Sequence, residues 1–172
     1  MFITEKKNLS GAFLKLKARL VAGGDQQDKT LYNDISAATA ATSTVFMVAA
    51  IAAREKRLIT VVDITCAYLN AKMSNQVVVH MKLDKRLTTM LVDLDGSYSR
   101  YINKDGGCIV RLDRALYGCV ESAALWADHI KGSLMSGGFI QNPHDICCYN
   151  KMYDNVQITV IIHVDDLLIT CT

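Results

Sequence analysis

Short apolar runs recur along the chain and predict strands. Apolar and basic residues alternate over residues 13–19, which is the pattern of a half-buried strand. Further apolar runs predict four more strands, at residues 58–64, 77–83, 108–112 and 146–153. Residues 156–162 and 167–171 are two more runs on either side of His163-Val164-Asp165-Asp166, a pattern that predicts a β-hairpin with an acidic tip.

Longer segments with helical periodicity separate these runs. Residues 42–55 are rich in alanine and repeat valine and alanine at helical spacing. Residues 121–135 form a second predicted helix, and Gly137 and Gly138 follow it where a left-handed C-cap is favoured. Polar residues and glycines at 23–34 predict a loop. Because strands and helices do not alternate strictly, the order favours an α+β sheet with helices on one face.

Composition restricts the class of protein. The chain has 172 residues, of which 51% are hydrophobic and 21% are charged, as in one globular domain. A net charge of +2 gives no general attraction to nucleic acid, and two basic clusters, at residues 6–19 and 54–57, are most simply solvated faces. The first residues do not resemble a signal peptide, and no apolar run reaches the ~20 residues of a membrane helix. The six scattered cysteines predict reduced thiols, so we expect an intracellular protein.

Candidate chemistry begins with Asp165 and Asp166. Two adjacent ionised carboxylates between apolar strands repel each other and resist the loss of water. A bound cation would compensate, whereas an exposed turn is the simpler explanation of the pair alone. Asp63 also follows an apolar run, so three carboxylates would converge if the two strands were neighbours. Such oxygen ligands suit Mg²⁺, and two ions about 4 Å apart serve phosphoryl transfer.

Four blocks of sequence resemble the reverse transcriptases of copia-type retrotransposons. Residues 62–70, VDITCAYLN, resemble the family pattern D-x-x-x-A-F/Y-L-N, and residues 17–22, KARLVA, resemble its K-A-R-L-V-A segment. Residues 115–118, ALYG, together with Trp126 resemble the A-L-Y-G block and the tryptophan that follows it. Residues 163–170, HVDDLLIT, resemble Y-V-D-D-x-L-I-T. The blocks also occur in the family's order.

The resemblance implies an RNA-directed DNA polymerase with the right-hand fold. In that fold an antiparallel palm sheet packs on helices, and the fingers fold over the incoming nucleotide. The fingers would comprise mainly residues 1–57 and about 84–120, and the palm about 58–83 and 121–172. The thumb and the RNase H domain would be absent. We therefore expect the fragment alone to hold a primed RNA or DNA template weakly, because backbone contacts provide most of the affinity.

The resemblance also implies roles for matching residues. Asp63 and Asp165 would bind two Mg²⁺ or Mn²⁺ ions, with Asp166 beside them, while a primer 3′-hydroxyl attacks the α-phosphate of a dNTP. Tyr68 matches the steric-gate position and would exclude a 2′-hydroxyl. The other implied contacts are those of Lys17 and Arg19 with the triphosphate, of Tyr117 and Gly118 with the nucleotide, and of His163 and Val164 with the primer end.

Two alternatives to a polymerase remain open. One is a non-catalytic retroelement remnant that acts at most as a binding or assembly module. The other is a metal-binding module of His144, Cys147 and Cys148, which is disfavoured because adjacent cysteines ligate one zinc ion awkwardly. The life cycle of the family predicts cytoplasmic virus-like particles as the setting.

Overall fold

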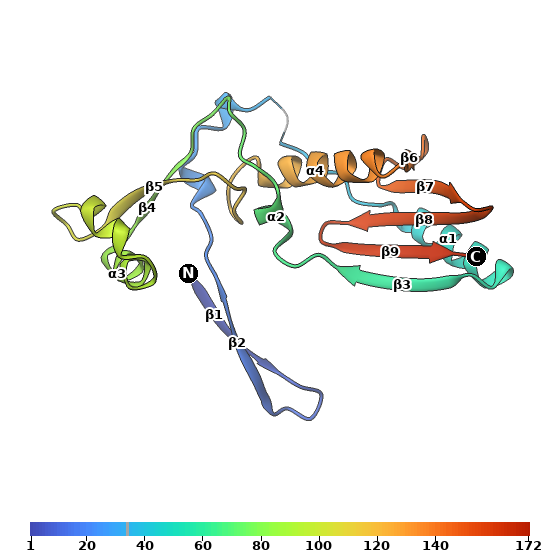
Figure 1. Cartoon of the computed structure of the whole chain (residues 1–172), viewed down its shortest axis with the longest axis horizontal. Helices are drawn as coiled ribbons and strands as arrows, with labels where there is room; N and C mark the ends of the chain where they lie inside the picture. Colours follow the sequence, from blue (N-terminus) through green and yellow to red (C-terminus); the bar gives the residue numbers. More distant parts are fainter. Residues whose placement is uncertain (34) are drawn as a thin grey trace.

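Three antiparallel sheets and several helices form a mixed α/β structure. The computed structural model describes residues 1–33 and 35–172, so Asp34, the last residue of the predicted loop, lies outside the described residues. Figure 1 shows the largest sheet at one end of the molecule, a small lobe at the other end, and a hairpin that projects between them.

The largest sheet has the strand order β3-β9-β8-β7-β6, and each neighbouring pair is antiparallel. Its strands are β3 (Leu58–Asp63), β6 (Ile140–Gln141), β7 (Cys148–Tyr153), β8 (Val156–His163) and β9 (Asp166–Cys171). Strands β8 and β9 form the predicted hairpin. The strands predicted at 58–64 and 146–153 are also confirmed, with ends that differ by one and two residues, whereas β6 was not predicted.

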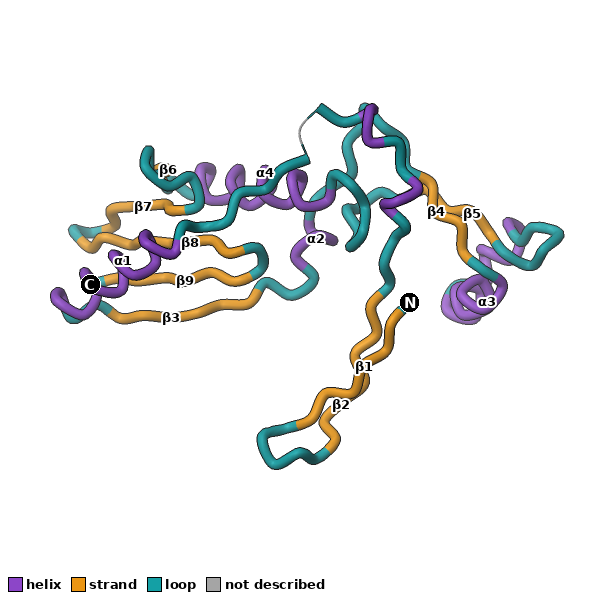
Figure 2. Tube along the Cα trace, turned by 180° about the vertical axis from the view of Figure 1, so that it is seen from behind, coloured by secondary structure: helices purple, strands orange, loops and turns teal. Residues whose placement is uncertain are grey.

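The helices α1 (Thr42–Glu55) and α4 (Ser122–Ser136) cover opposite faces of this sheet (Figure 2). A cavity under α1 is lined by Cys148 and Thr159, whereas α4 packs against Tyr149 and Val160. Consecutive residues of a strand point to opposite faces, so the expectation of helices on one face is wrong. The reason lies in β8, where the consecutive residues 159–162 are all buried, because a strand buried on both faces needs cover on both.

The main hydrophobic core lies between α4 and the sheet. Trp126 and Ile130 of α4 pack against Tyr149 of β7 and against Val160 and Ile162 of β8. Each large apolar side chain that is fully buried contributes roughly 1.5–3 kcal/mol, so this cluster is what holds the helix on the strands.

The remaining elements form two smaller units. Strands β1 (Phe2–Lys7) and β2 (Phe13–Arg19) pair as the projecting hairpin. Strands β4 (His80–Leu83) and β5 (Cys108–Arg111) pair in the small lobe, beside α3 (Lys85–Leu94). Short helical turns lie at Gly24–Gln26, Lys29–Leu31 and Gly96–Tyr101 and, as α2, at Ala67–Asn70. Only the second half of the strand predicted at 77–83 pairs with a neighbour.

Asp145 ties the start of α1 to the loop before β7. Its carboxylate accepts hydrogen bonds from the backbone N–H of Ala41 at 3.0 Å and of Cys147 at 2.9 Å. Burial raises the pKa of Asp145, but these bonds and one from the Thr44 side chain outweigh it and hold the pKa below its usual value. A charged acceptor at a helix N-terminus is stabilising.

Replacing Asp145 by Asn should lower the free energy of unfolding by about 1–2 kcal/mol at neutral pH, because the charged acceptor is lost. A carboxylate with a lowered pKa contributes stability above its unfolded pKa, and that contribution disappears as the pH falls through the folded value. Denaturant unfolding of Asp145→Asn and of the wild type should therefore converge in acid. The matched control is Asp154→Asn, in the exposed turn between β7 and β8. An equal loss of stability in both variants would contradict this role.

Candidate active site

A turn of two residues closes the hairpin of β8 and β9. Strand β8 ends at His163 and β9 begins at Asp166, so Val164 and Asp165 form the turn. Val164 has a φ of 58°, a left-handed conformation that β-branched residues rarely adopt. Such a backbone persists only where the surrounding contacts hold it in place.

Three aspartates share this end of the sheet. Asp63, the last residue of β3, pairs with Asp166, the first residue of β9. The backbone N–H of Ile64 donates to the carbonyl oxygen of Asp165 at 2.8 Å, which ties the turn to the strand that carries Asp63. Asp63 and Asp166 are exposed and Asp165 is half-buried. None of the three forms an ion pair within the described part of the chain.

A cavity of about 720 Å³ opens beside the turn. Asp63 and Asp165 line it from the sheet, and Lys17 and Arg19 line it from β2. Tyr117 also lines it, from the loop before α4. Carboxylates and cations therefore face the same space, from elements that lie far apart in the sequence.

Cationic side chains share one face of the projecting hairpin. Lys15, Lys17 and Arg19 alternate along β2 and so point to the same face, and Lys6 of β1 pairs with Lys15. All four line the cavity. This face supplies fixed positive charge opposite the aspartates.

The pKa of Tyr117 is shifted by charged residues on both sides of the cavity. Burial raises the pKa of Tyr117, Asp165 and then Tyr68 raise it further, and Arg19 lowers it. The ring centroids of Tyr68 and Tyr117 are 4.5 Å apart, with the planes tilted by 45°. Arg19 of β2 is thus the cation whose charge lowers the pKa of this phenol.

Gly118 lets the backbone of the loop before α4 meet the segment after β2. Its φ is 92°, and a Cβ atom there would collide with the carbonyl oxygen of Ala22. A Cβ atom at Gly24 would likewise collide with the carbonyl oxygen of Gly118. The N–H of Ala22 donates to the carbonyl oxygen of Tyr117 at 2.7 Å. The close approach at Gly118 is thus to the chain's own backbone.

Several of the residues singled out in the sequence lie outside the cavity. Five of them do not line it: Tyr68, Gly118, His163, Val164 and Asp166. Tyr68 and Val164 instead line a smaller, mainly apolar cavity of about 130 Å³, together with Trp126. His163 is exposed and pairs with Asp166 at the end of β8.

The aspartates have the donor chemistry for a divalent cation. In residues 1–33 and 35–172, no three His, Cys, Asp or Glu side chains are gathered closely enough to hold a metal ion. The backbone nevertheless sets Asp63 opposite Asp166, and Asp165 precedes Asp166 in the turn, so three carboxyl groups belong to the same end of the sheet. Hard oxygen donors of this kind fit Mg²⁺.

The alternative metal module is not supported by the geometry of its cysteines. Cys147 packs in the core under α4, whereas Cys148 lines the cavity under α1 on the opposite face of the sheet. Burial raises the pKa of both thiols, which opposes the thiolate form that zinc requires. His144, Cys147 and Cys148 form no metal-holding group among the described residues.

Two features of buried polar groups were not predicted from the sequence. Glu121 is 7% exposed, and its Oε1 atom has no hydrogen-bond partner in the part of the chain that the structure describes. Burial raises the pKa of Glu121. Trp126 packs in the core under α4 and also donates its indole N–H to the carbonyl oxygen of Val164 at 2.6 Å. No local sequence pattern predicts the burial of Glu121 or the bond from Trp126 to Val164, because both depend on residues that the fold brings together.

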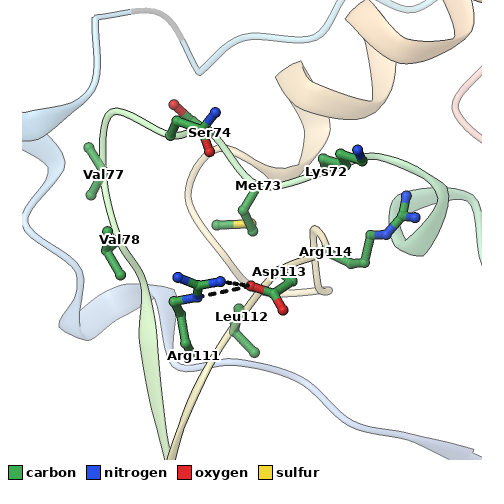
Figure 3. Close-up of a pocket in the computed structure, with 10 residues that line it drawn as sticks. Lys72, Met73, Ser74, Val77, Val78, Arg111, Leu112, Asp113 and Arg114 are labelled. Carbon is green, nitrogen blue, oxygen red and sulfur yellow. Dashed lines mark hydrogen bonds and ion pairs between the residues drawn. The ribbon is translucent and has the colours of Figure 1, made fainter.

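A second cavity, of about 400 Å³, lies between the two chain segments that join the small lobe to the rest of the molecule, residues 72–78 and 111–114 (Figure 3). The N–H of Met73 bonds to Asp113, and the N–H of Leu112 bonds to Val79, while residues 74–78 loop out between these contacts. The charged residues that line the cavity are Lys72, Arg111, Asp113 and Arg114. Among the residues that the structure describes, Asp113 pairs with Arg111 alone, at 2.8 Å, so the cavity has an excess of positive charge.

Comparison with known proteins gives the class of this chain. Residues 1–172 match the family model described as reverse transcriptase (RNA-dependent DNA polymerase), so the chain belongs to that family. It is similar to the Retrovirus-related Pol polyprotein from transposon RE1 of Arabidopsis thaliana, with 24% identity over 169 residues. Together these matches identify a fragment of a copia-type reverse transcriptase, as the sequence blocks predicted.

The similarity covers 97% of this chain but only 10% of that relative, so the chain spans about a tenth of the polyprotein's length. No solved structure gives a significant match. In the described residues, no helix has the length and apolar character needed to cross a membrane.

Proposed function

We propose that the chain is the fingers and palm of an RNA-directed DNA polymerase that adds deoxynucleotides to a primer 3′-hydroxyl. The observation that carries this proposal is the pairing of Asp63 with Asp166 beside Asp165, at a cavity lined on its other side by Lys17 and Arg19. The proposed palm is the five-stranded sheet with α4, at about 58–83 and 121–172. The proposed fingers, mainly 1–57 and about 84–120, contain the β1–β2 hairpin together with α3 and β5 of the small lobe, whereas β4 of that lobe falls within the range given to the palm.

Asp63 and Asp165 are the residues that would hold two Mg²⁺ or Mn²⁺ ions, with Asp166 beside them. When bound, such ions supply positive charge for the attacking and leaving oxygens. The chain's own cations would act on the triphosphate. Arg19 acts on Tyr117 across the cavity, and its guanidinium presents several donors to phosphate oxygens, so we assign it the closer contact and Lys17 the outer one.

Tyr117 and Tyr68 would form the floor under the sugar of the incoming dNTP. Tyr117 lines the cavity, and the Tyr68 ring packs on it from the apolar side. A tyrosine pair is a rigid support, because each side chain has only two rotatable bonds. We assign the exclusion of a 2′-hydroxyl to Tyr68, with Gly118 shaping the adjacent backbone. A Tyr68→Val variant that still rejected ribonucleotides would remove Tyr68 from this role.

The primed template would meet the protein at two places. His163 and Val164 are exposed at the turn, where a primer end would lie next to Asp165. The excess of cations in the second cavity suits the phosphates of a single-stranded template (Figure 3). The cavity is connected to the site through short stretches of chain, from Tyr68 to Lys72 and from Arg114 to Tyr117.

Metal binding can be measured without polymerase activity. Trp126 is the only tryptophan of the chain, and it bonds to the residue before Asp165. Paramagnetic Mn²⁺ quenches nearby fluorescence, so titration with Mn²⁺ should quench the emission of the wild type. Asp165→Asn should need about tenfold more Mn²⁺ or higher, because a ligand is lost. Asp154→Asn, the same change at the opposite hairpin, should titrate like the wild type. Equal quenching in Asp165→Asn would remove Asp165 from the metal site.

If the second cavity binds the template, removing its positive charges should weaken the binding of single-stranded RNA. Replacing both Lys72 and Arg111 by Gln should weaken the binding of labelled single-stranded RNA about tenfold and lower its salt dependence, because phosphate contacts release counterions. The matched control is Arg86→Gln with Lys104→Gln, which removes the same charges from exposed positions outside this cavity. Fluorescence anisotropy measures both. An equal effect of the two double variants would show only a general charge effect.

The alternative is a non-catalytic retroelement remnant that serves as a binding or assembly module. It agrees with one observation, that no three His, Cys, Asp or Glu side chains of the described residues are gathered closely enough to hold a metal ion. In the polymerase reading, the thumb and RNase H portions would belong to the rest of a polyprotein. The cytoplasmic, particle-associated setting stays a prediction.

A further inference from the structure

Hydrogen bonds from two different elements hold the peptide units on both sides of Asp165. The peptide before it is held through the carbonyl oxygen of Val164, which accepts the indole N–H of Trp126 at 2.6 Å. The peptide after it is held through its own carbonyl oxygen, which accepts the N–H of Ile64 at 2.8 Å. The direction of the Asp165 side chain is set by these two peptides, because its Cα atom lies between them.

The first of these bonds acts on the strained residue of the turn. Val164 has a φ of 58°, a left-handed conformation that is strained for a β-branched residue. Relief of this strain requires rotation about the N–Cα bond of Val164, and that rotation would also swing the Val164 carbonyl away from the indole. The bond from Trp126 therefore opposes the motion that the strain favours.

Trp126 is a firm support for this bond. Its side chain is 4% exposed, and it packs in the core of α4 with Tyr149, Val160 and Ile162. A buried indole N–H normally finds an acceptor, and here the acceptor is the turn rather than another group of the core. Rigid support from a neighbouring shell is what a precise binding geometry requires.

Trp126 also meets the proposed nucleotide floor. Tyr68, Trp126 and Val164 line the same apolar cavity of about 130 Å³, at the junction of α2, α4 and the turn. One side chain thus contacts the space behind both the tyrosine pair and the carboxylate turn. Removing the indole N–H of Trp126 would therefore affect the turn directly, whereas an aromatic ring at position 126 would still fill the core.

We infer that Trp126 is a positioning residue, which holds Asp165 in its ligand orientation through the bond from its indole N–H to the Val164 carbonyl. The inference deepens the proposed function and rests on it for the role of Asp165. The matched pair of variants is Trp126→Phe and Tyr149→Phe. Each keeps a ring in the same core and removes one polar group, since the Tyr149 hydroxyl accepts from Gln141 at 3.1 Å.

Hydrogen exchange tests the positioning without any metal or substrate. In the full chain, exchange of the amides of residues 163–167 should be about tenfold faster in Trp126→Phe, because one hydrogen bond that opposes opening of the turn is lost. The turn in Tyr149→Phe should exchange as in the wild type. Unchanged exchange in Trp126→Phe, or an equal increase in both variants, would overturn the inference.

Metal affinity then separates this inference from the proposed function. The signal of free Mn²⁺ in electron paramagnetic resonance measures binding without the tryptophan. Trp126→Phe should bind Mn²⁺ about tenfold more weakly, and Tyr149→Phe should bind like the wild type. If the wild type showed no binding that depends on Asp165, the proposed metal site would fail, while faster exchange in Trp126→Phe would still establish the positioning of the turn. Mn²⁺ binding unchanged in Trp126→Phe would overturn the link between the bond and the ligand.

Discussion

The site depends on the register between β3 and β9. Six residue pairs join these strands, and the last pair sets Asp63 opposite Asp166. A slip of one residue would turn Asp63 to the other face of the sheet. Like charges held this close repel each other by about 1 kcal/mol at 4 Å in water, and by more where water is excluded. Backbone pairing along the whole strand is what holds the carboxylates together against that repulsion.

A second constraint brings the positive charge to the carboxylates. Lys17 and Arg19 lie about a hundred residues before Tyr117 and Gly118, yet they line or border the same space. The backbone contact between Ala22 and Tyr117 joins the two segments, and glycine is required because a Cβ atom at Gly118 would collide with Ala22. The proposed catalytic surface would therefore be assembled from one end of the sheet, a hairpin and one loop.

The sequence predicted the parts of the fold that local patterns determine. The helix at Thr42–Glu55, the helix that ends before Gly137 and the acidic hairpin all follow from periodicity and turn chemistry. The contacts that tertiary structure creates had no local signal. Burial of β8 on both faces, the capping of α1 by Asp145 and the bond from Trp126 to Val164 belong to this class. Family blocks identified candidate residues, and the structure explains why Gly118 must be glycine while leaving Tyr68 outside the main cavity.

Primer extension on poly(rA)·oligo(dT) with Mg²⁺ or Mn²⁺ tests the central claim most directly. We expect the wild type and Asp154→Asn to add deoxythymidylate, and Asp165→Asn not to add it. Extension that survived in Asp165→Asn would contradict the assignment of the carboxylate turn as the catalytic centre, and folded wild-type protein without any extension would favour the non-catalytic remnant.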